Sequence, residues 1–185
     1  MTHRLIARCR PPVAVPAPGS ALHRLVSNLE RCGGVVPPDQ LRAVIEANPV
    51  GLDDVSDFLC VDASTYSRNR VVRTDRYEVL VFCWCSGQRS TIHDHEGSAC
   101  GVRVVCGAAT EIVFERVPGG DRVRAARTQR LRGGEITASF DADIHQIAND
   151  DPAAVLLVTL HVYSPPLDEM NVYEAVPAAA KGAAA

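Results

Sequence analysis

The chain has 185 residues, of which 46% are hydrophobic and 22% charged, and its formal net charge is -3. This length suits one domain with its own core, and the slightly negative charge gives no electrostatic reason to expect a nucleic acid or membrane partner. No apolar run approaches the roughly 20 residues that a membrane helix needs. The seven cysteines are odd in number and scattered, which indicates a reducing cytoplasm rather than a disulfide framework.

The two ends of the chain differ in composition from its middle. Residues 1–19 contain no acidic residue, three arginines and four prolines, so we expect a disordered N-terminal tail. One folded domain is expected over residues 20–175. The alanine-rich residues 176–185 are expected to form a second, frayed tail.

Apolar residues at helical spacing predict helices near the N-terminus. The first spans Ala21–Arg31 and stops before a Gly-Gly pair. A second is opened by Pro37-Pro38-Asp39 and closed by Asn48-Pro49, and a short third one is predicted over Asp53–Leu59. We expect these helices, within about residues 20–60, to pack outside a larger body and to carry no chemistry.

From Tyr66 onwards, short segments rich in β-branched residues alternate with glycine-rich turns. No helical pattern intervenes, which disfavours a parallel α/β sheet and favours an antiparallel sandwich or barrel over about residues 66–165. The predicted strands are Arg76–Cys85, Gly101–Val105, Glu111–Arg116, Arg122–Thr128, Glu135–Ser139 and Ala153–Tyr163. In the first of them, Cys83 and Cys85 are interpreted as buried reduced thiols rather than metal ligands, because no second cysteine pair accompanies them.

Two histidines one residue apart, His93 and His95, indicate a metal site. Side chains at this spacing lie on the same face of a strand, so their imidazoles can converge on one ion. A third ligand must come from elsewhere in the chain. Of the other histidines, His145 and His161 fall in the predicted β region.

The residues around these histidines resemble the two motifs of the cupin superfamily. The first motif is matched by Gly87, His93, His95 and Gly107, with Cys100 where it normally has a glutamate. The second is matched by Gly134, His145 and Asn149, with Phe140 and Ala142 replacing its proline and second glycine. The resemblance implies a double-stranded β-helix, or jelly-roll barrel, with the two or three helices outside and one metal ion inside.

Within that superfamily, three segments are similar to cysteine dioxygenase: Tyr66-Ser-Arg-Asn69, Ser90-Thr-Ile-His-Asp-His95 and His161-Val-Tyr-Ser-Pro-Pro166. The similarity covers roughly residues 66–172, and the N-terminal helices also fit. It implies one Fe(II) per chain on His93, His95 and His145, and oxidation of L-cysteine by O2 to cysteine sulfinic acid, with both oxygen atoms on sulfur. Three neutral imidazoles leave two positive charges on Fe(II), which favours an anionic ligand such as a thiolate. We therefore predict a cytoplasmic, monomeric oxidoreductase of cysteine catabolism.

The same resemblance implies roles for further residues. Arg68 resembles the arginine that binds the substrate carboxylate, and Tyr66 the phenol beside it. Thr159, His161 and Tyr163 share one strand face and resemble the family's Ser-His-Tyr relay, with threonine in place of serine. 

Cys100 resembles the cysteine that vertebrate-type members join to this tyrosine by a thioether, whereas many bacterial-type members have glycine there. A Cys100–Tyr163 crosslink and a packed thiol both stay open.

Three alternatives are kept. The first is a dioxygenase for another small thiol such as 3-mercaptopropionate, although relatives with that preference tend to carry glutamine where Arg68 stands. The second is a three-histidine zinc hydrolase or hydratase. The third is a non-catalytic cupin that binds a ligand.

Overall fold

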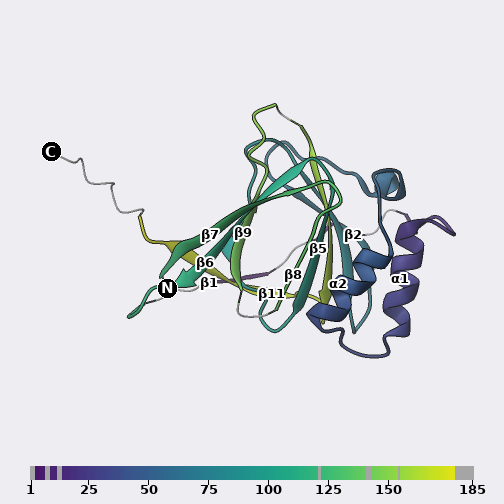
Figure 1. The fold of residues 1–185 in the computed structure, drawn as a ribbon, viewed down its shortest axis with the longest axis horizontal. Helices are drawn as coiled ribbons and strands as arrows, with labels where there is room; N and C mark the ends of the chain where they lie inside the picture. Colours follow the sequence, from purple (N-terminus) through teal and green to yellow (C-terminus); the bar gives the residue numbers. More distant parts are fainter. Residues whose placement is uncertain are drawn as a thin grey trace.

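The structure is a computed structural model that describes residues 3–6, 9–11, 14–120, 122–140, 143–153 and 155–177. These residues form a barrel of two facing, mostly antiparallel sheets, with helices on one outer face (Figure 1). The first sheet contains, in spatial order, β1 (His3–Ile6), β11 (Glu169–Ala175), β4 (Ile92–His93), β9 (Ile144–Ala148), β6 (Ala108–Arg116) and β7 (Arg122–Arg132). The second contains β2 (Ser67–Arg73), β3 (Glu78–Trp84), β10 (Leu157–Ser164), β5 (Ala99–Cys106) and β8 (Ile136–Phe140). The prediction of a mainly antiparallel barrel is confirmed.

The helical elements lie close to their predicted positions. They are α1 (Ala21–Arg31), α2 (Pro38–Ala47) and the 3-10 helix η1 (Asp53–Phe58). The side chain of Ser20 caps α1 by accepting a hydrogen bond from the His23 amide. Helix α2 packs on β5 at Gly101, where an added Cβ would lie 2.5 Å from Ile45 Cδ1, so a larger residue there would require the Ile45 side chain to move. Among the described residues, the helices are too short or too polar to cross a bilayer.

Strands β3 and β10 lie side by side in the five-stranded sheet and are buried along their whole length. Side chains alternate along β10: Val158, Leu160 and Val162 pack in the core cluster under the helices. His161 and Tyr163 face the opposite way and line a cavity inside the barrel. Burial on both faces explains why this segment is a nearly continuous apolar run, and it places the remaining polar side chains in a closed interior.

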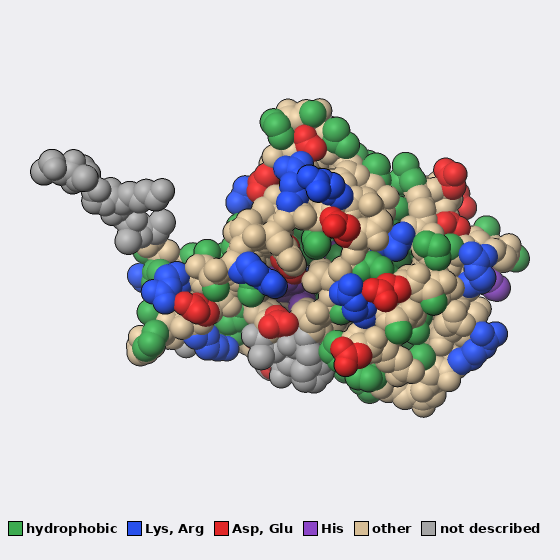
Figure 2. All heavy atoms as spheres, in the orientation of Figure 1, with side chains coloured by type: hydrophobic (Ala, Val, Ile, Leu, Met, Phe, Trp, Pro, Cys, Tyr) green, Lys and Arg blue, Asp and Glu red, His purple; other side chains and the backbone are tan. Residues whose placement is uncertain are grey.

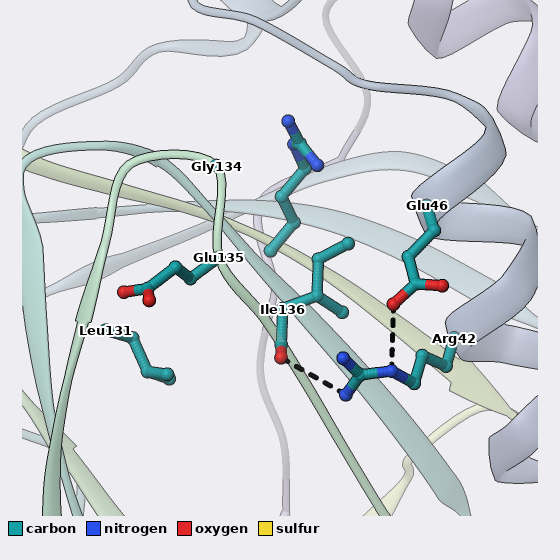
Figure 3. Close-up of a pocket in the computed structure, with 7 residues that line it drawn as sticks. Arg42, Glu46, Leu131, Gly134, Glu135 and Ile136 are labelled. Carbon is teal, nitrogen blue, oxygen red and sulfur yellow. Dashed lines mark hydrogen bonds and ion pairs between the residues drawn. The ribbon is translucent and has the colours of Figure 1, made fainter.

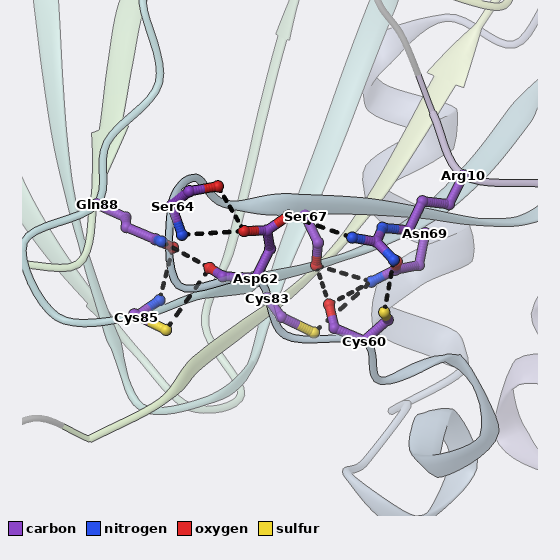
Figure 4. Close-up of polar contacts among 9 residues, drawn as sticks. All are labelled: Arg10, Cys60, Asp62, Ser64, Ser67, Asn69, Cys83, Cys85 and Gln88. Atoms are coloured by element: carbon purple, nitrogen blue, oxygen red, sulfur yellow. Dashed lines mark hydrogen bonds and ion pairs between the residues drawn. The ribbon is translucent and has the colours of Figure 1, made fainter.

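The N-terminal segment differs from the expected disordered tail. Residues 3–6 pair with β11, and Arg10 bridges Asn69 of β2. The Arg10 side chain also contacts the Cys60 thiol at 3.0 Å and Asp62 at 3.3 Å (Figure 4). These contacts cannot be predicted from the local sequence, because the residues pair with the exposed edges of strands that are far away in the chain. Of the expected C-terminal tail, residues 178–185 lie outside the described part.

The barrel continues past its expected end at residue 165, because β11 follows. This strand escaped prediction since its buried residues, Met170 and Tyr173, are three apart and break the period of two. Cys83 is a buried free thiol, as predicted, whereas Cys85 is only half-buried (Figure 4).

Candidate active site

The structure brings the three predicted histidine ligands together inside the barrel. His93 on β4 is the direct cross-strand partner of His145 on β9, and His95 follows β4 by two residues. All three side chains are buried, and their potential ligand atoms lie within 4.8 Å of one another. Among the His, Cys, Asp and Glu side chains of the described residues, these three are close enough together to hold one metal ion.

Hydrogen bonds decide which ring nitrogen two of these histidines present. Nδ1 of His93 lies 2.9 Å from the Thr91 carbonyl, and Nδ1 of His145 lies 2.9 Å from Glu111 Oε1. Both oxygens can only accept here, so each Nδ1 carries the hydrogen and each Nε2 is left as the ligand atom. Burial lowers the pKa of His93 to about 3, so its ring is neutral and able to bind a metal.

His95 supplies the observation that tests the fit of a metal ion. It is fully buried, and neither ring nitrogen has a hydrogen-bond partner among the described residues. A buried polar atom without a partner costs about 1–3 kcal/mol. An ion held between the three imidazoles would satisfy one of these nitrogens, so the residues present fit a metal.

Asp94, between the two neighbouring histidines, ties this turn to β11. Its carboxylate accepts hydrogen bonds from the Tyr173 hydroxyl at 2.6 Å and from the Asn171 side-chain amide at 2.9 Å. It also accepts one from the Asn171 backbone amide at 3.1 Å. These bonds restrict the backbone that carries His93 and His95.

Arg68, on β2, points its guanidinium into the same cavity. Its Nε and Nη2 are buried without a hydrogen-bond partner in the described part of the chain, and the group lies 5.0 Å above the ring of Phe82. Tyr66 stacks on Trp84, with 4.2 Å between ring centres, and completes an aromatic wall. Burying a cation with unpaired donors is costly, so the site is built for an anionic partner.

A chain of hydrogen bonds connects Trp84 to Tyr163. The indole Nε1 donates to Thr159 Oγ1 at 3.0 Å, and this oxygen lies 2.9 Å from His161 Nε2. His161 Nδ1 lies 3.2 Å from the Tyr163 hydroxyl. Because an indole only donates, the threonine hydrogen is available for Nε2, which assigns the imidazole hydrogen to Nδ1. Nδ1 then donates to the Tyr163 oxygen, and the phenol hydrogen is free to point into the cavity.

Cys100 and Tyr163 are direct cross-strand partners on β5 and β10. Burial raises the pKa of both the Cys100 thiol and the Tyr163 phenol. Both groups are therefore neutral.

A small cavity joins these groups, with about 280 Å³ of empty space. It is lined by Tyr66, Arg68, Phe82, Trp84, Ser90, His93, His145, Ile147, His161 and Tyr163. A larger hollow of about 750 Å³ lies where α2 meets β8 (Figure 3). There Arg42 forms an ion pair with Glu46 of the same helix at 2.9 Å and donates to the Ile136 carbonyl at 3.4 Å. The charge of Arg42 is therefore engaged in packing α2 on β8. The smaller cavity, which is lined by histidines, Arg68 and Tyr163, is therefore the candidate active site.

The comparison with known proteins agrees with this geometry. The family described as cysteine dioxygenase type I matches residues 21–176. The chain belongs to this family. Cysteine dioxygenase type 1 of Rattus norvegicus is 27% identical over 148 residues, which are 77% of this chain and 72% of the rat protein. The Homo sapiens protein of the same name is 26% identical over 159 residues, which are 83% of this chain and 75% of the human protein. The prediction of an oxidoreductase of the cysteine dioxygenase type is confirmed at the level of the family.

Solved structures support the fold. A Klebsiella pneumoniae protein with a double-stranded β-helix domain aligns with a TM-score of 0.51 at 18% identity, covering 65% of this chain and 95% of that protein. The predicted cupin fold class, with N-terminal helices added to the barrel, is confirmed.

Three residues of this candidate site are not identified by the sequence patterns. Phe82 and Trp84 lie in the predicted strand Arg76–Cys85, and their spacing of two puts both on the inward face of β3. Glu111 is the first residue of the predicted strand Glu111–Arg116. A signal for Glu111 is present in the sequence of β6, because this acidic residue alternates with Ala109 and Val113 and so shares a strand face with apolar side chains. An acidic residue on such a face is unusual and indicates a specific partner.

Buried neutral histidines should make the metal-free protein sensitive to acid. Burial lowers the pKa of His93 to about 3 and holds those of His95 and His161 well below the usual value. The unfolded chain binds protons near pH 6.5 and the folded chain does not, so the free energy of unfolding falls as pH drops below about 6.5, towards pH 3. Each group contributes up to about 1.4 kcal/mol per pH unit.

Urea unfolding of metal-free protein at about pH 7.5, 6 and 5 measures this slope. A His161→Phe variant should give a shallower slope, because one of the depressed groups is gone. A free energy of unfolding that stays constant across this pH range would contradict the assignment of neutral rings.

Proposed function

We propose that the protein is an Fe(II)-dependent thiol dioxygenase that oxidises L-cysteine with O2 to cysteine sulfinic acid. The observation that carries this proposal is the placement of three converging imidazoles around one small cavity, together with a buried guanidinium of which two nitrogens lack a hydrogen-bond partner among the described residues. The histidines offer a metal face, and the arginine offers a site for a carboxylate. A small molecule that carries both a thiol and a carboxylate matches this pair.

His93, His95 and His145 would hold the iron. When bound, Fe(II) supplies the deprotonation of the substrate thiol and the activation of O2. Cys100 stands where cupins usually place a glutamate ligand, and its pKa is raised by burial, so it adds no charge of its own. The ligand set therefore leaves the positive charge of the metal available to a substrate thiolate.

The protein's own groups position the substrate. The Arg68 fork would bind the carboxylate in two hydrogen bonds, and the aromatic wall of Tyr66 and Trp84 would exclude water behind it. Tyr163 would act as a donor towards the reacting atoms, because its pKa is raised well above the usual value by burial. Thr159 and His161 would set the direction of that hydrogen through the bonds described above.

We also propose that a Cys100–Tyr163 thioether can form. Their direct cross-strand pairing on β5 and β10, with both side chains buried, supports it. Forming the C–S bond removes one hydrogen from the ring and one from the thiol, with O2 as the oxidant. After turnover with cysteine, iron and O2, peptide mapping should reveal a linked peptide pair lighter by two hydrogen atoms. Unlinked side chains after prolonged turnover would refute the thioether and would leave the proposed reaction standing.

The deciding experiment reconstitutes metal-free protein with Fe(II) or Zn(II) and measures O2 uptake and sulfinate formation. With Fe(II), we expect one O2 consumed for each cysteine oxidised, and both atoms of isotopically labelled O2 in the sulfinate. Activity with Zn(II) alone, or cysteine binding without sulfinate, would overturn the proposal. A higher kcat/KM for 3-mercaptopropionate than for cysteine would overturn the choice of substrate.

A further inference from the structure

Glu111 is a buried charged residue directly behind one of the metal ligands. It is 3% exposed, and its Oε1 accepts a hydrogen bond from His145 Nδ1 at 2.9 Å. Its other oxygen accepts from the side-chain amide of Gln129 on β7. In the β6–β9 ladder Glu111 is opposite Ile147, and His145 is opposite Val113, so the two side chains are diagonal neighbours on one face.

Hydrogen bonds hold both oxygens of the Glu111 carboxylate. His145 Nδ1 donates to one oxygen at 2.9 Å, and the side-chain amide of Gln129 donates to the other. Glu111 and His145 also line a surface hollow. Arg127 lies in the wall of this hollow and adds a positive charge that favours the carboxylate. A hollow with histidine atoms at its floor is visible in the face shown in Figure 2.

The three imidazoles differ in what stands behind them. His93 donates to a neutral backbone carbonyl, and His95 has no hydrogen-bond partner among the described residues. His145 donates to the carboxylate of Glu111. A carboxylate behind a ligating histidine fixes its tautomer and ring orientation and makes the ligand nitrogen more basic. The negative charge that the ligand set lacks is thus present one imidazole away from the metal position.

We propose that Glu111 is a positioning residue that holds Nε2 of His145 towards the metal and brings a compensating negative charge to the site. This inference rests on the proposed metal-dependent function, because it requires an ion at the three histidines. Gln129 has a supporting role, since its amide occupies the second carboxylate oxygen and restricts the rotation of Glu111. A neutral glutamine in place of Glu111 would lose the charge and would offer one acceptor to two donors.

The test is the affinity of the metal-free protein for Co(II) and, without oxygen, for Fe(II), measured by competition with a chromophoric chelator. Glu111→Gln should weaken binding about 10- to 100-fold, and Glu111→Ala at least as much. Glu115→Gln is the matched control, because Glu115 is on the same strand, exposed and paired only with the surface residue Arg124 among the contacts described. Its affinity should stay within about twofold of the unaltered protein.

The melting temperature of each metal-free variant separates positioning from folding. A purely structural role for Glu111 would lower the melting temperature and leave the metal affinity unchanged, and that result overturns the proposal. Equal losses of affinity in Glu111→Gln and Glu115→Gln also overturn it, since they would reflect general charge. If Glu111→Ala does not fold, Glu111→Gln decides.

The outcome is distinguishable from a failure of the proposed function. If the unaltered protein binds metal in a Glu111-dependent way but forms no sulfinate, only the proposed reaction is wrong. If the unaltered protein binds neither Co(II) nor Fe(II), both proposals are wrong.

Discussion

Replacing His95 with leucine should abolish metal binding and activity while making the metal-free protein more stable. The imidazole is fully buried, and neither nitrogen has a hydrogen-bond partner in the described part of the chain. Leucine has a similar volume and no polar atom to leave unsatisfied. Removing the unsatisfied atoms should raise the free energy of unfolding by about 1–3 kcal/mol. For a chain of this size, that corresponds to a rise in melting temperature of about 2–12 °C.

Activity should fall below detection, because two imidazoles at this site leave a metal without its third protein ligand. The two effects are read from one set of melting curves, recorded with and without Fe(II). The unaltered protein should melt higher when the metal is added, and His95→Leu should show no such shift.

The matched control is His93→Leu, which also removes a ligand but breaks the hydrogen bond between His93 Nδ1 and the Thr91 carbonyl. This variant should lose metal binding and be no more stable than the unaltered protein when both lack metal. A His95→Leu protein that melts below the unaltered metal-free protein would refute the idea that His95 is stabilised mainly by the ion.

The opposite signs expected for these two histidines show what the sequence could and could not predict about the site. Two histidines with one residue between them predict a common strand face, because side chains alternate with a period of two. His145 is added by the resemblance to the second cupin motif. The partners of the ring nitrogens depend on contacts across the barrel. Thr91 is local to His93, whereas Glu111 reaches His145 from a separate strand. Such pairings are set by sheet register, which the local pattern of β6 leaves undetermined.

The fold divides in the same way. The predicted helix Ala21–Arg31 matches α1, because an amphipathic stripe and a glycine pair after its end are local signals. Strands β1 and β11 were missed, because their stability comes from pairing with each other and with distant strands. Trp84 lies in the predicted strand Arg76–Cys85, and its role as the donor to Thr159 appears only when β3 and β10 are placed side by side.

Replacing Arg68 with glutamine should lower kcat/KM for L-cysteine about 100-fold, mainly by raising KM. The guanidinium has two buried nitrogens without a hydrogen-bond partner among the described residues, and in the proposed complex they bind the substrate carboxylate. Each hydrogen bond to a charged group is worth about 1.5–3 kcal/mol, and about 1.4 kcal/mol corresponds to a factor of ten. Glutamine is shorter and neutral, so it can replace neither the fork nor the charge.

Cysteamine, which lacks the carboxylate, makes this experiment specific to the contact. The unaltered protein should prefer cysteine strongly, and Arg68→Gln should bring the two kcat/KM values close together by lowering that for cysteine. Arg124→Gln is the control, because Arg124 is exposed and its pairing with Glu115 lies on the surface. It should leave both values unchanged.

Iron content and stability decide whether a loss of activity in Arg68→Gln comes from the substrate contact. The three histidines do not contact the removed donors, so the variant should retain iron. Its free energy of unfolding should be no lower than that of the unaltered protein, since the substitution removes a buried charge with unpaired donors. An unchanged KM for cysteine at full iron content would refute the carboxylate-binding role of Arg68. It would also require another cation to offset the substrate's negative charge in a cavity that contains no other arginine or lysine in its lining.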